Sequence, residues 1–552
     1  MNAGSKTVFA REVKKLVDLK LFDSAQTLCT LFASQLCAPP PLSSVQAGES
    51  VSSSLAEVYE MLADCLLERG EVKRALQTFR QATQQRKSTL GCKYRHQSPI
   101  SSAEDALLRL KECRCLVLLQ DTSALRELEG VPAKFRDTQT HLLLGELYQA
   151  GGRRRNAAAS YREVLLAAPT ALEVVEKLVD LGVEAADILS TLDEAFRYRE
   201  EGAQGGLSQG WLHSLVAALA HKRSCDHDRS QAHMQKLTAA YPQNAYLLTH
   251  MAQLAQECGQ AASARSLYSQ VRALEPLQVG GMASYGLLLL QEGDSAELSR
   301  LTSAVLDCAD KDPTGWLLAA MYSSLQGEGE SALQLVDKAV RLSPSSSQTY
   351  KLKGQLLCTQ GSHSQALIAY SQANSLLRDL PSYAGLLRSS LALGRSKEAA
   401  GTARQCLAAL PRSAQAHVLM GGVFAQAGAD SAEALSAYAK ALQLDPRNKE
   451  AAAGMAGVLT AQGKLDEAAE CLVGVLERVN CHALRLQLGK TYASLGRYQQ
   501  SVENLHMAAS LGKEGGEAET EALQELERVE TLLRGETMEA EEEDEEEEEE
   551  EG

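Results

Sequence analysis

The sequence predicts an all-α solenoid of stacked helix pairs, and three observations support this fold class. Alanine, an aromatic residue and proline recur at fixed intervals, as in Ala434, Tyr438, Ala441 and Pro446. A small residue such as Gly145 or Gly421 stands about thirteen residues before the first alanine of each set. No segment shows the alternation of apolar and polar residues that is typical of a half-buried strand.

The recurrence has a period of about 34 residues, which is the signature of the tetratricopeptide repeat, a helix–turn–helix unit. Small residues let the two helices of a unit approach closely, the aromatic residue fills the wedge between units, and proline ends the second helix. One helix pair cannot bury its apolar face alone, so neighbouring units must stack. The residues that we expect to pack the repeats together are Leu144, Gly145, Tyr148, Ala157, Tyr161, Pro169, Ala264, Tyr268, Pro276, Ala332, Ala339, Pro344, Gly354, Ala366, Tyr370, Gly421, Ala434, Tyr438, Ala441 and Pro446.

A glycine marks the turn between the two helices of most units, where it supplies a positive φ without steric cost. These turn glycines are Gly70, Gly152, Gly259, Gly293, Gly327, Gly361, Gly394, Gly428, Gly463 and Gly496. About fourteen helix pairs are expected when degenerate units near residues 9–36, 104–132, 172–199 and 210–241 are included.

The repeats divide the chain into segments. We expect N-terminal repeats, with loops at 38–54 and 87–103, then degenerate repeats, regular C-terminal repeats, a capping helix and an acidic tail. Their boundaries are 9–170, 171–244, 245–511, 516–534 and 535–552.

Most of the net charge of −16 comes from the end of the chain. Residues 539–551 contain twelve acidic side chains, so that 59 acidic and 55 basic residues remain elsewhere. Such a charge run is expected to be disordered. The solenoid itself has no basic excess, which argues against a nucleic-acid-binding role.

The sequence predicts neither membrane insertion nor secretion. No window of 18 uncharged apolar residues occurs, and charged residues interrupt the first twenty positions. The thirteen cysteines form no CxxC pair, and most of them fall inside helical patterns. We therefore expect reduced, buried thiols in a nuclear and cytoplasmic protein.

Catalytic motifs for phosphate, dinucleotide, zinc-protease and serine-hydrolase chemistry are absent from the sequence, so we expect neither an enzyme nor a cofactor. One cluster could in principle hold zinc: His221, Cys225, His227 and His233. Its spacing matches no standard structural zinc site, and a charged, solvated loop is the favoured interpretation.

The remaining binding surface is the concave groove, which first helices line in such repeats. Repeats that bind chaperone tails hold a carboxylate with lysine, asparagine and arginine. Here Lys351 occupies the first clamp position, but Gln355 and Gly385 stand where asparagines belong. The clamp is therefore not met. Lys351, Gln355, Arg388 and Lys490 remain candidates for a partner groove that attracts an acidic group.

Several stretches resemble a particular family. The segment Gly280–Gly293, the Trp316 unit with Lys338-Ala339, and the run from Tyr350 to Gly354 are similar to the subunit-7 family of the anaphase-promoting complex. Tyr161–Leu165 before Pro169 fits as well. The resemblance spans roughly residues 9–511 and is weak over 172–240.

This resemblance implies a non-catalytic scaffold in a multi-subunit, cullin-RING-type ubiquitin ligase that controls mitotic progression and exit. It implies sister repeat subunits as partners and a homodimer joined through the N-terminal repeats, residues 9–170. Two alternatives stay open: a sister repeat subunit of the same complex, and an unrelated transport or co-chaperone scaffold.

Overall fold

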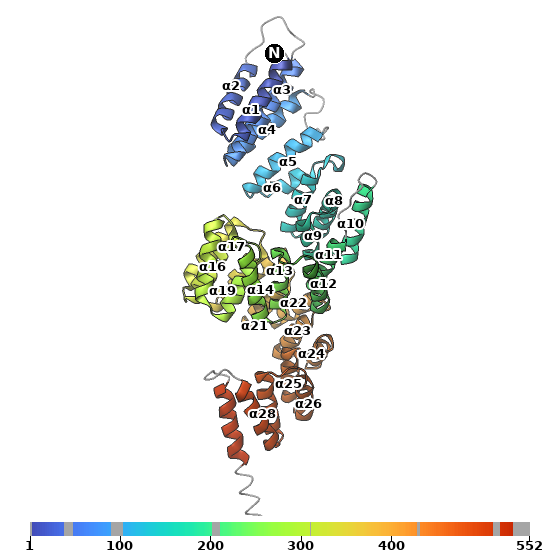
Figure 1. Cartoon of the computed structure of the whole chain (residues 1–552), viewed down its shortest axis with the longest axis vertical. Helices are drawn as coiled ribbons and strands as arrows, with labels where there is room; N and C mark the ends of the chain where they lie inside the picture. The colour runs from blue at the N-terminus through green and yellow to red at the C-terminus, as the bar shows by residue number, and fades with distance from the viewer. Residues whose placement is uncertain are drawn as a thin grey trace, which may run out of the picture. The chain divides into compact units, whose positions relative to one another are not determined.

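The computed structural model describes residues 3–37, 48–89, 103–200, 210–309, 311–427, 431–511 and 519–533, and every regular element in these ranges is a helix (Figure 1). The chain divides into two compact units, Met1–Gly205 and Gly206–Gly552. The division falls inside the glycine-rich stretch between residues 200 and 210, and therefore within the segment predicted to hold degenerate repeats, 171–244.

The first unit consists of antiparallel helices in which neighbours along the chain pack together. A short 3₁₀ helix, η2 (Ala133–Phe135), lies between α6 and α7. The α-helices are α1 (Ala3–Asp18), α2 (Phe22–Cys37), α3 (Gly48–Glu68), α4 (Val72–Thr89), α5 (Ala103–Leu118), α6 (Ser123–Glu129), α7 (Thr138–Ala150), α8 (Arg154–Ala167), α9 (Leu172–Asp180) and α10 (Ala185–Glu200).

The second unit continues the same pairing (Figure 1). Its helices are α11 (Gly210–Arg223), α12 (His227–Ala240), α13 (Ala245–Glu257), α14 (Ala261–Leu274), α15 (Met282–Glu292), α16 (Ser295–Cys308), α17 (Pro313–Leu325), α18 (Gly329–Leu342), α19 (Ser347–Thr359), α20 (His363–Leu376), α21 (Leu380–Ala392), α22 (Ser396–Ala409), α23 (Ala414–Ala427), α24 (Ser431–Leu444), α25 (Lys449–Ala461), α26 (Leu465–Leu476), α27 (His482–Ser494) and α28 (Tyr498–Leu511). Helices α1–α28 make fourteen pairs, which confirms the predicted all-α repeat solenoid.

The turn within each pair follows the glycine rule. Every predicted turn glycine in the described ranges has a positive φ, from 70° at Gly152 to 81° at Gly70 and Gly327, and Gly428 lies outside those ranges. Three pairs without a glycine place Lys20, Gln120 and Cys225 in the same left-handed conformation, with φ of 57° to 60°. Stacking therefore imposes the turn even where the residue does not favour it.

Side-chain caps and prolines set the helix ends. Asp137, Asn244 and Asp294 each accept a hydrogen bond from a backbone N–H of the first turn of α7, α13 and α16, which satisfies one of the free donors there. Helices α8, α14, α18 and α24 each end two residues before a proline, because the residue preceding proline disfavours the helical conformation.

The predicted loops need a correction. Residues 48–54 belong to α3 and residues 87–89 to α4, whereas the sequence placed both inside loops because of the prolines, serines and glycines in 38–54 and 87–103. A serine-rich end can extend an existing helix because adding a residue to a formed helix costs far less than starting one. Residues 38–47 and 90–102 lie outside the described residues.

The predicted capping helix is helical over its described part, residues 519–533. Its Ala522, Leu526 and Val529 pack against Leu505 and Ala508 of α28. The acidic segment from residue 534 onward lies outside the described residues.

Candidate partner-binding groove and repeat interfaces

Tyr370 lies on α20, the second helix of its repeat, between glycines of α19 and α21, the first helices of two successive repeats. A Cβ atom on Gly354 of α19 would lie 2.7 Å from the Tyr370 ring, and one on Gly385 of α21 would lie 2.3 Å from it. Tyr370 itself is 5% exposed. The ring therefore fills the whole space between α19 and α21, and glycine is required on both sides of it.

Tyr438 on α24, two helix pairs further along the chain, repeats this arrangement. A Cβ atom on Gly421 would approach its ring to 2.8 Å, and one on Gly454 of α25 would approach it to 2.4 Å. In the compact unit Met1–Gly205, Tyr161 faces Gly145 in a similar way. A Cβ atom on Gly145 would lie 2.4 Å from the Tyr161 ring. At Tyr370 and Tyr438 the aromatic wedge thus links one repeat to the repeat that follows.

Two repeat interfaces use other residues for the same purpose. Tyr268 stacks on Tyr285 of the following repeat, with ring centroids 4.9 Å apart. Above Gly286 the space is filled by Leu318 of the following repeat, which a Cβ atom on that glycine would meet at 2.2 Å. Either of two adjacent repeats can supply the large side chain that fills the space between them, provided that the facing residue of the other repeat is small.

The structure buries the residues that the spacing singled out for packing. Leu144, Gly145, Tyr148, Ala157, Tyr161, Ala264, Tyr268, Ala332, Ala339, Gly354, Ala366, Tyr370, Gly421, Ala434, Tyr438 and Ala441 are all buried. Pro169 is buried as well, whereas Pro276, Pro344 and Pro446 are exposed, because their part is to end a helix and not to fill the core.

Lys351 is engaged by its own chain. Its Nζ lies 2.5 Å from Oδ2 of Asp379. The other oxygen of Asp379 accepts hydrogen bonds from the backbone N–H and the hydroxyl of Ser382, and so caps α21. Burial acts to raise the pKa of Asp379, but Lys351 and Ser382 together hold that pKa below its ordinary value. Lys351 therefore joins two repeats and is not free to bind a partner's carboxylate.

Lys490 is engaged too, since its Nζ lies 2.8 Å from Glu521 and 3.8 Å from Glu525 of the C-terminal helix 519–533. Gln355 on α19 and Arg388 on α21 are exposed. The structure therefore does not gather the four predicted groove residues into one cluster of free polar groups. The sequence could not reveal this, because Asp379 and Glu521 stand 28 and 31 residues away from their lysines.

We compared the chain with known protein families and with solved structures. Family models described as tetratricopeptide repeat match residues 140–175, 385–449 and 429–481. The chain therefore has the fold of a tetratricopeptide-repeat solenoid. Anaphase-promoting complex subunit 7 of Arabidopsis thaliana is 28% identical over 546 residues, which cover 95% of this chain and 94% of that protein. The protein of the same name from Homo sapiens is 26% identical over 489 residues, 86% of this chain and 85% of its own length.

A solved structure shares the fold along its whole length. It is described as the crystal structure of the APC/C hetero-tetramer Cut9-Hcn1, with a TM-score of 0.53, 16% identity and 96% of each chain covered. The solved structure shows the shared fold, and the curated relatives confirm the resemblance of this chain to subunit 7 of the anaphase-promoting complex.

The four candidate zinc ligands of this tetratricopeptide-repeat solenoid lie on and around the turn between α11 and α12. Cys225 takes the turn position, His221 lies on α11, and His227 and His233 lie on α12. The rings of His221 and His233 stack with centroids 5.7 Å apart. Among the described residues, no three His, Cys, Asp or Glu side chains come together as metal ligands would. The run was expected to be a loop, but helix pairing draws its two ends into α11 and α12.

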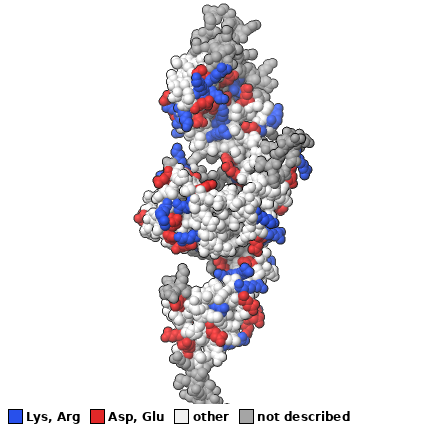
Figure 2. Space-filling view, in the orientation of Figure 1, with Lys and Arg blue, Asp and Glu red and all other residues white. Residues whose placement is uncertain are grey.

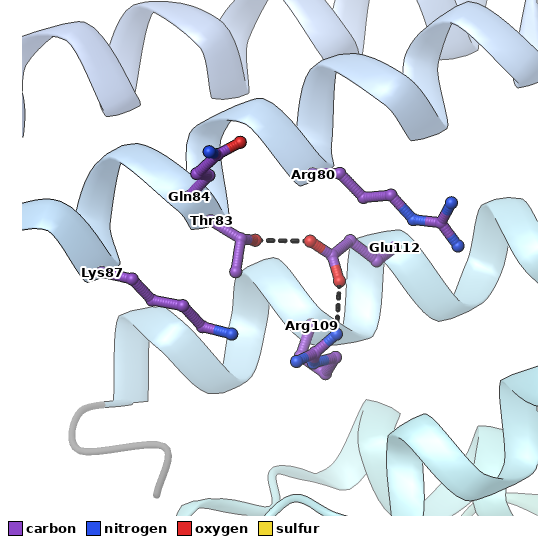
Figure 3. Close-up of a pocket in the computed structure, with 6 residues that line it drawn as sticks. All are labelled: Arg80, Thr83, Gln84, Lys87, Arg109 and Glu112. Carbon is purple, nitrogen blue, oxygen red and sulfur yellow. Dashed lines mark hydrogen bonds and ion pairs between the residues drawn. The ribbon is translucent and has the colours of Figure 1, made fainter. Parts of the chain in front are cut away.

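Two hollows lie on the described part of the chain. One of about 250 Å³ lies between α4 and α5, lined by Arg80, Thr83, Gln84, Lys87, Arg109 and Glu112 (Figure 3). Another of about 280 Å³ lies among α12, α13 and α14, with Cys258 at its edge. Burial raises the pKa of Cys258, which disfavours the reactive thiolate. In the part of the chain that the structure describes, no helix is long and apolar enough to cross a bilayer.

Proposed function

We propose that this chain is a non-catalytic scaffold subunit of the anaphase-promoting complex, a multi-subunit ubiquitin ligase of the cullin-RING type that controls mitotic progression and exit. The observation that supports it best is the similarity to subunit 7, which extends over 95% of this chain in the Arabidopsis thaliana protein. Repeat interfaces that are built from apolar wedges fit a role in holding other proteins. The corresponding places of action are the nucleus and the cytoplasm.

The partners we propose are sister repeat subunits and a second copy of the chain. Subunit 3 of the same complex from Dictyostelium discoideum is 29% identical over 110 residues, so related repeats occur in more than one subunit. For a homodimer through residues 9–170, the edge formed by α1 and α2 offers Leu19, Leu21 and Leu31, which are 60%, 49% and 63% exposed. Exposed large apolar side chains are a common feature of protein contact surfaces.

Co-purification tests the proposed function. A tagged full chain expressed in cells should capture a megadalton-scale assembly that contains RING and cullin-like subunits. Capture of chaperones alone, or elution of the chain by itself, would refute the scaffold role and favour an unrelated repeat adaptor.

Light scattering after size exclusion tests the dimer. We expect twice the 59.4 kDa chain mass, and we expect one chain mass when Leu19, Leu21 and Leu31 are changed together to lysine. The matched control changes three other exposed leucines to lysine: Leu274, Leu342 and Leu444, at the ends of α14, α18 and α24. Equal masses for the two triple variants would contradict the proposed contact.

A further inference from the structure

Helix α4 is the most one-sidedly charged helix surface of the first unit. It carries five basic residues and no acidic one: Lys73, Arg74, Arg80, Arg86 and Lys87. Arg74 pairs with Glu71 and Arg86 with Glu60. In the described ranges, no ion pair joins Lys73, Arg80 or Lys87 to an acidic residue, and all three are exposed. Figure 2 shows basic side chains, with acidic ones among them, on this N-terminal part of the molecule.

These three cations form a single row. They stand seven residues apart, which places them on one helix face at intervals of about 10.5 Å. Gln77 and Gln84 lie between them on the same face and are exposed as well. We call the five residues Lys73, Gln77, Arg80, Gln84 and Lys87 the α4 stripe. The opposite face of α4 holds Ala75, Phe79 and Ala82, which are completely buried.

A hollow of about 250 Å³ opens beside the stripe, between α4 and α5 (Figure 3). The Glu112 carboxylate in this hollow is paired within the chain. Thr83 donates a hydrogen bond to one of its oxygens, and Arg109 lies 2.8 Å from the other. The Glu112 side chain is 4% exposed. Arg80 and Lys87 line the same hollow and leave their charge available.

Two acids near the stripe, Glu127 and Asp121, have partners of their own. Glu127 lies 2.8 Å from Arg109. Asp121 feels the charge of Arg80, but its carboxylate accepts a hydrogen bond from the backbone N–H of Ser123, and its pKa is lowered chiefly by that bond. The stripe therefore presents lysine and arginine to solvent beside a hollow that can take a carboxylate.

The chain itself contains a complementary segment. Residues 539–551 carry twelve carboxylates in thirteen positions. The described part ends at residue 533, and the nineteen residues beyond it can span at most about 65 Å when extended. An extended segment rises about 3.3 Å per residue, so acidic residues at every third position match the spacing of the three cations.

We propose that the α4 stripe binds the acidic run at residues 539–551 of a second copy of the chain, with one carboxylate in the hollow beside Arg80 and Lys87. Binding is electrostatic and multivalent: each exposed pair contributes little by itself, and several pairs act together. It therefore weakens steeply with salt, since added ions screen exposed charges beyond about 10 Å at 0.1 M and about 3 Å at 1 M.

The test uses the full chain with its twelve terminal acids changed to glutamine, titrated with a fluorescent peptide of residues 536–552. We expect saturable binding at 50 mM salt that weakens at least tenfold at 500 mM. Changing Lys73, Arg80 and Lys87 to glutamate should weaken it at least tenfold, and changing them to glutamine should weaken it less. The matched control reverses Lys236, Lys397 and Lys440, which are exposed, lie on α12, α22 and α24, and alter the net charge equally.

Capture distinguishes a second copy from a free peptide. The tagged glutamine-tailed chain should retain more untagged wild-type chain than untagged glutamine-tailed chain, and the difference should disappear when the stripe is reversed. Failure of the peptide to bind, equal losses in the stripe and control variants, or equal capture of both tails would overturn the proposal. So would duplex DNA that displaces the peptide and binds more tightly through the same residues, because the stripe would then recognise phosphate. Circular dichroism of each variant confirms that it is folded.

Discussion

Replacing Gly385 with alanine should destabilise the second unit, although alanine is the better helix former. The new Cβ atom would lie 2.3, 2.4 and 2.5 Å from three atoms of the Tyr370 ring. The ring cannot move away, because it is also close to Gly354 of α19, where a Cβ atom would meet it at 2.7 Å. Either the ring or one of the helices must shift.

The magnitude follows from two opposing effects. Overpacking a filled core costs about 1–3 kcal/mol, whereas replacing glycine inside a helix gains about 0.5–1 kcal/mol. We expect a net loss of about 1 kcal/mol, and at most about 2.5 kcal/mol. Gly401 provides the matched control: it lies in the middle of α22, and a Cβ atom there would meet nothing within 4 Å. Gly401→Ala should therefore stabilise the chain by up to about 1 kcal/mol.

Thermal unfolding followed by calorimetry measures both variants. Because repeat arrays need not unfold in one step, the comparison is made on the transition that shifts and not on a global free energy. Gly385→Ala should lower the midpoint and Gly401→Ala should raise it. Adding Tyr370→Leu to Gly385→Ala should recover part of the loss, since the smaller side chain leaves room for the methyl group. A Gly385→Ala variant that melts as high as Gly401→Ala would refute the account of the wedge.

The remaining predictions concern the Lys351 pair, the turns and the candidate metal cluster. Lys351→Met should destabilise the chain by about 1–3 kcal/mol, because Asp379 is left buried without its cation, whereas Lys353→Met, which breaks the more exposed pair with Asp337, should cost less than about 1 kcal/mol. The pKa of Asp379 is lowered in the folded chain. The stabilisation by this pair is therefore fully present above the ordinary aspartate pKa of about 3.9 and is lost as the pH falls below it. Urea titrations that give the same difference in unfolding free energy between wild type and Lys351→Met at pH 7 and at pH 3 would contradict this. Gly152→Ala, at φ 70° with open space around it, should lower the melting midpoint, and Gln120→Gly, at φ 57°, should raise it or leave it unchanged, since only glycine adopts this conformation without strain. Metal chelation should leave the melting midpoint within error, and stoichiometric zinc in the purified protein would restore His221, Cys225, His227 and His233 as ligands.

Much of the architecture could be predicted because it depends on local rules. The glycine turns, the helix ends before Pro169 or Pro344 and the pairing of helices each need only a few neighbouring residues. The prediction was wrong at residues 48–54, where serine content suggested a loop and the helix continues. Sequence reasoning also missed Gly385 and Gly454 as wedge partners, because the tyrosine that each contacts belongs to the preceding repeat.

By itself, the sequence determined that this chain is a helical repeat solenoid, where its turns lie, and which family it resembles, since each of these depends on spacing along the chain. Only the tertiary structure decided which charges are available. Lys351 and Lys490 were equal candidates for a groove with Arg388, yet Asp379 and Glu521 engage the two lysines across repeat boundaries, while Lys73, Arg80 and Lys87 stay exposed on one face of α4. The physical reason is that an ion pair depends on distance in space, and stacking brings together residues that lie about one repeat apart in the chain.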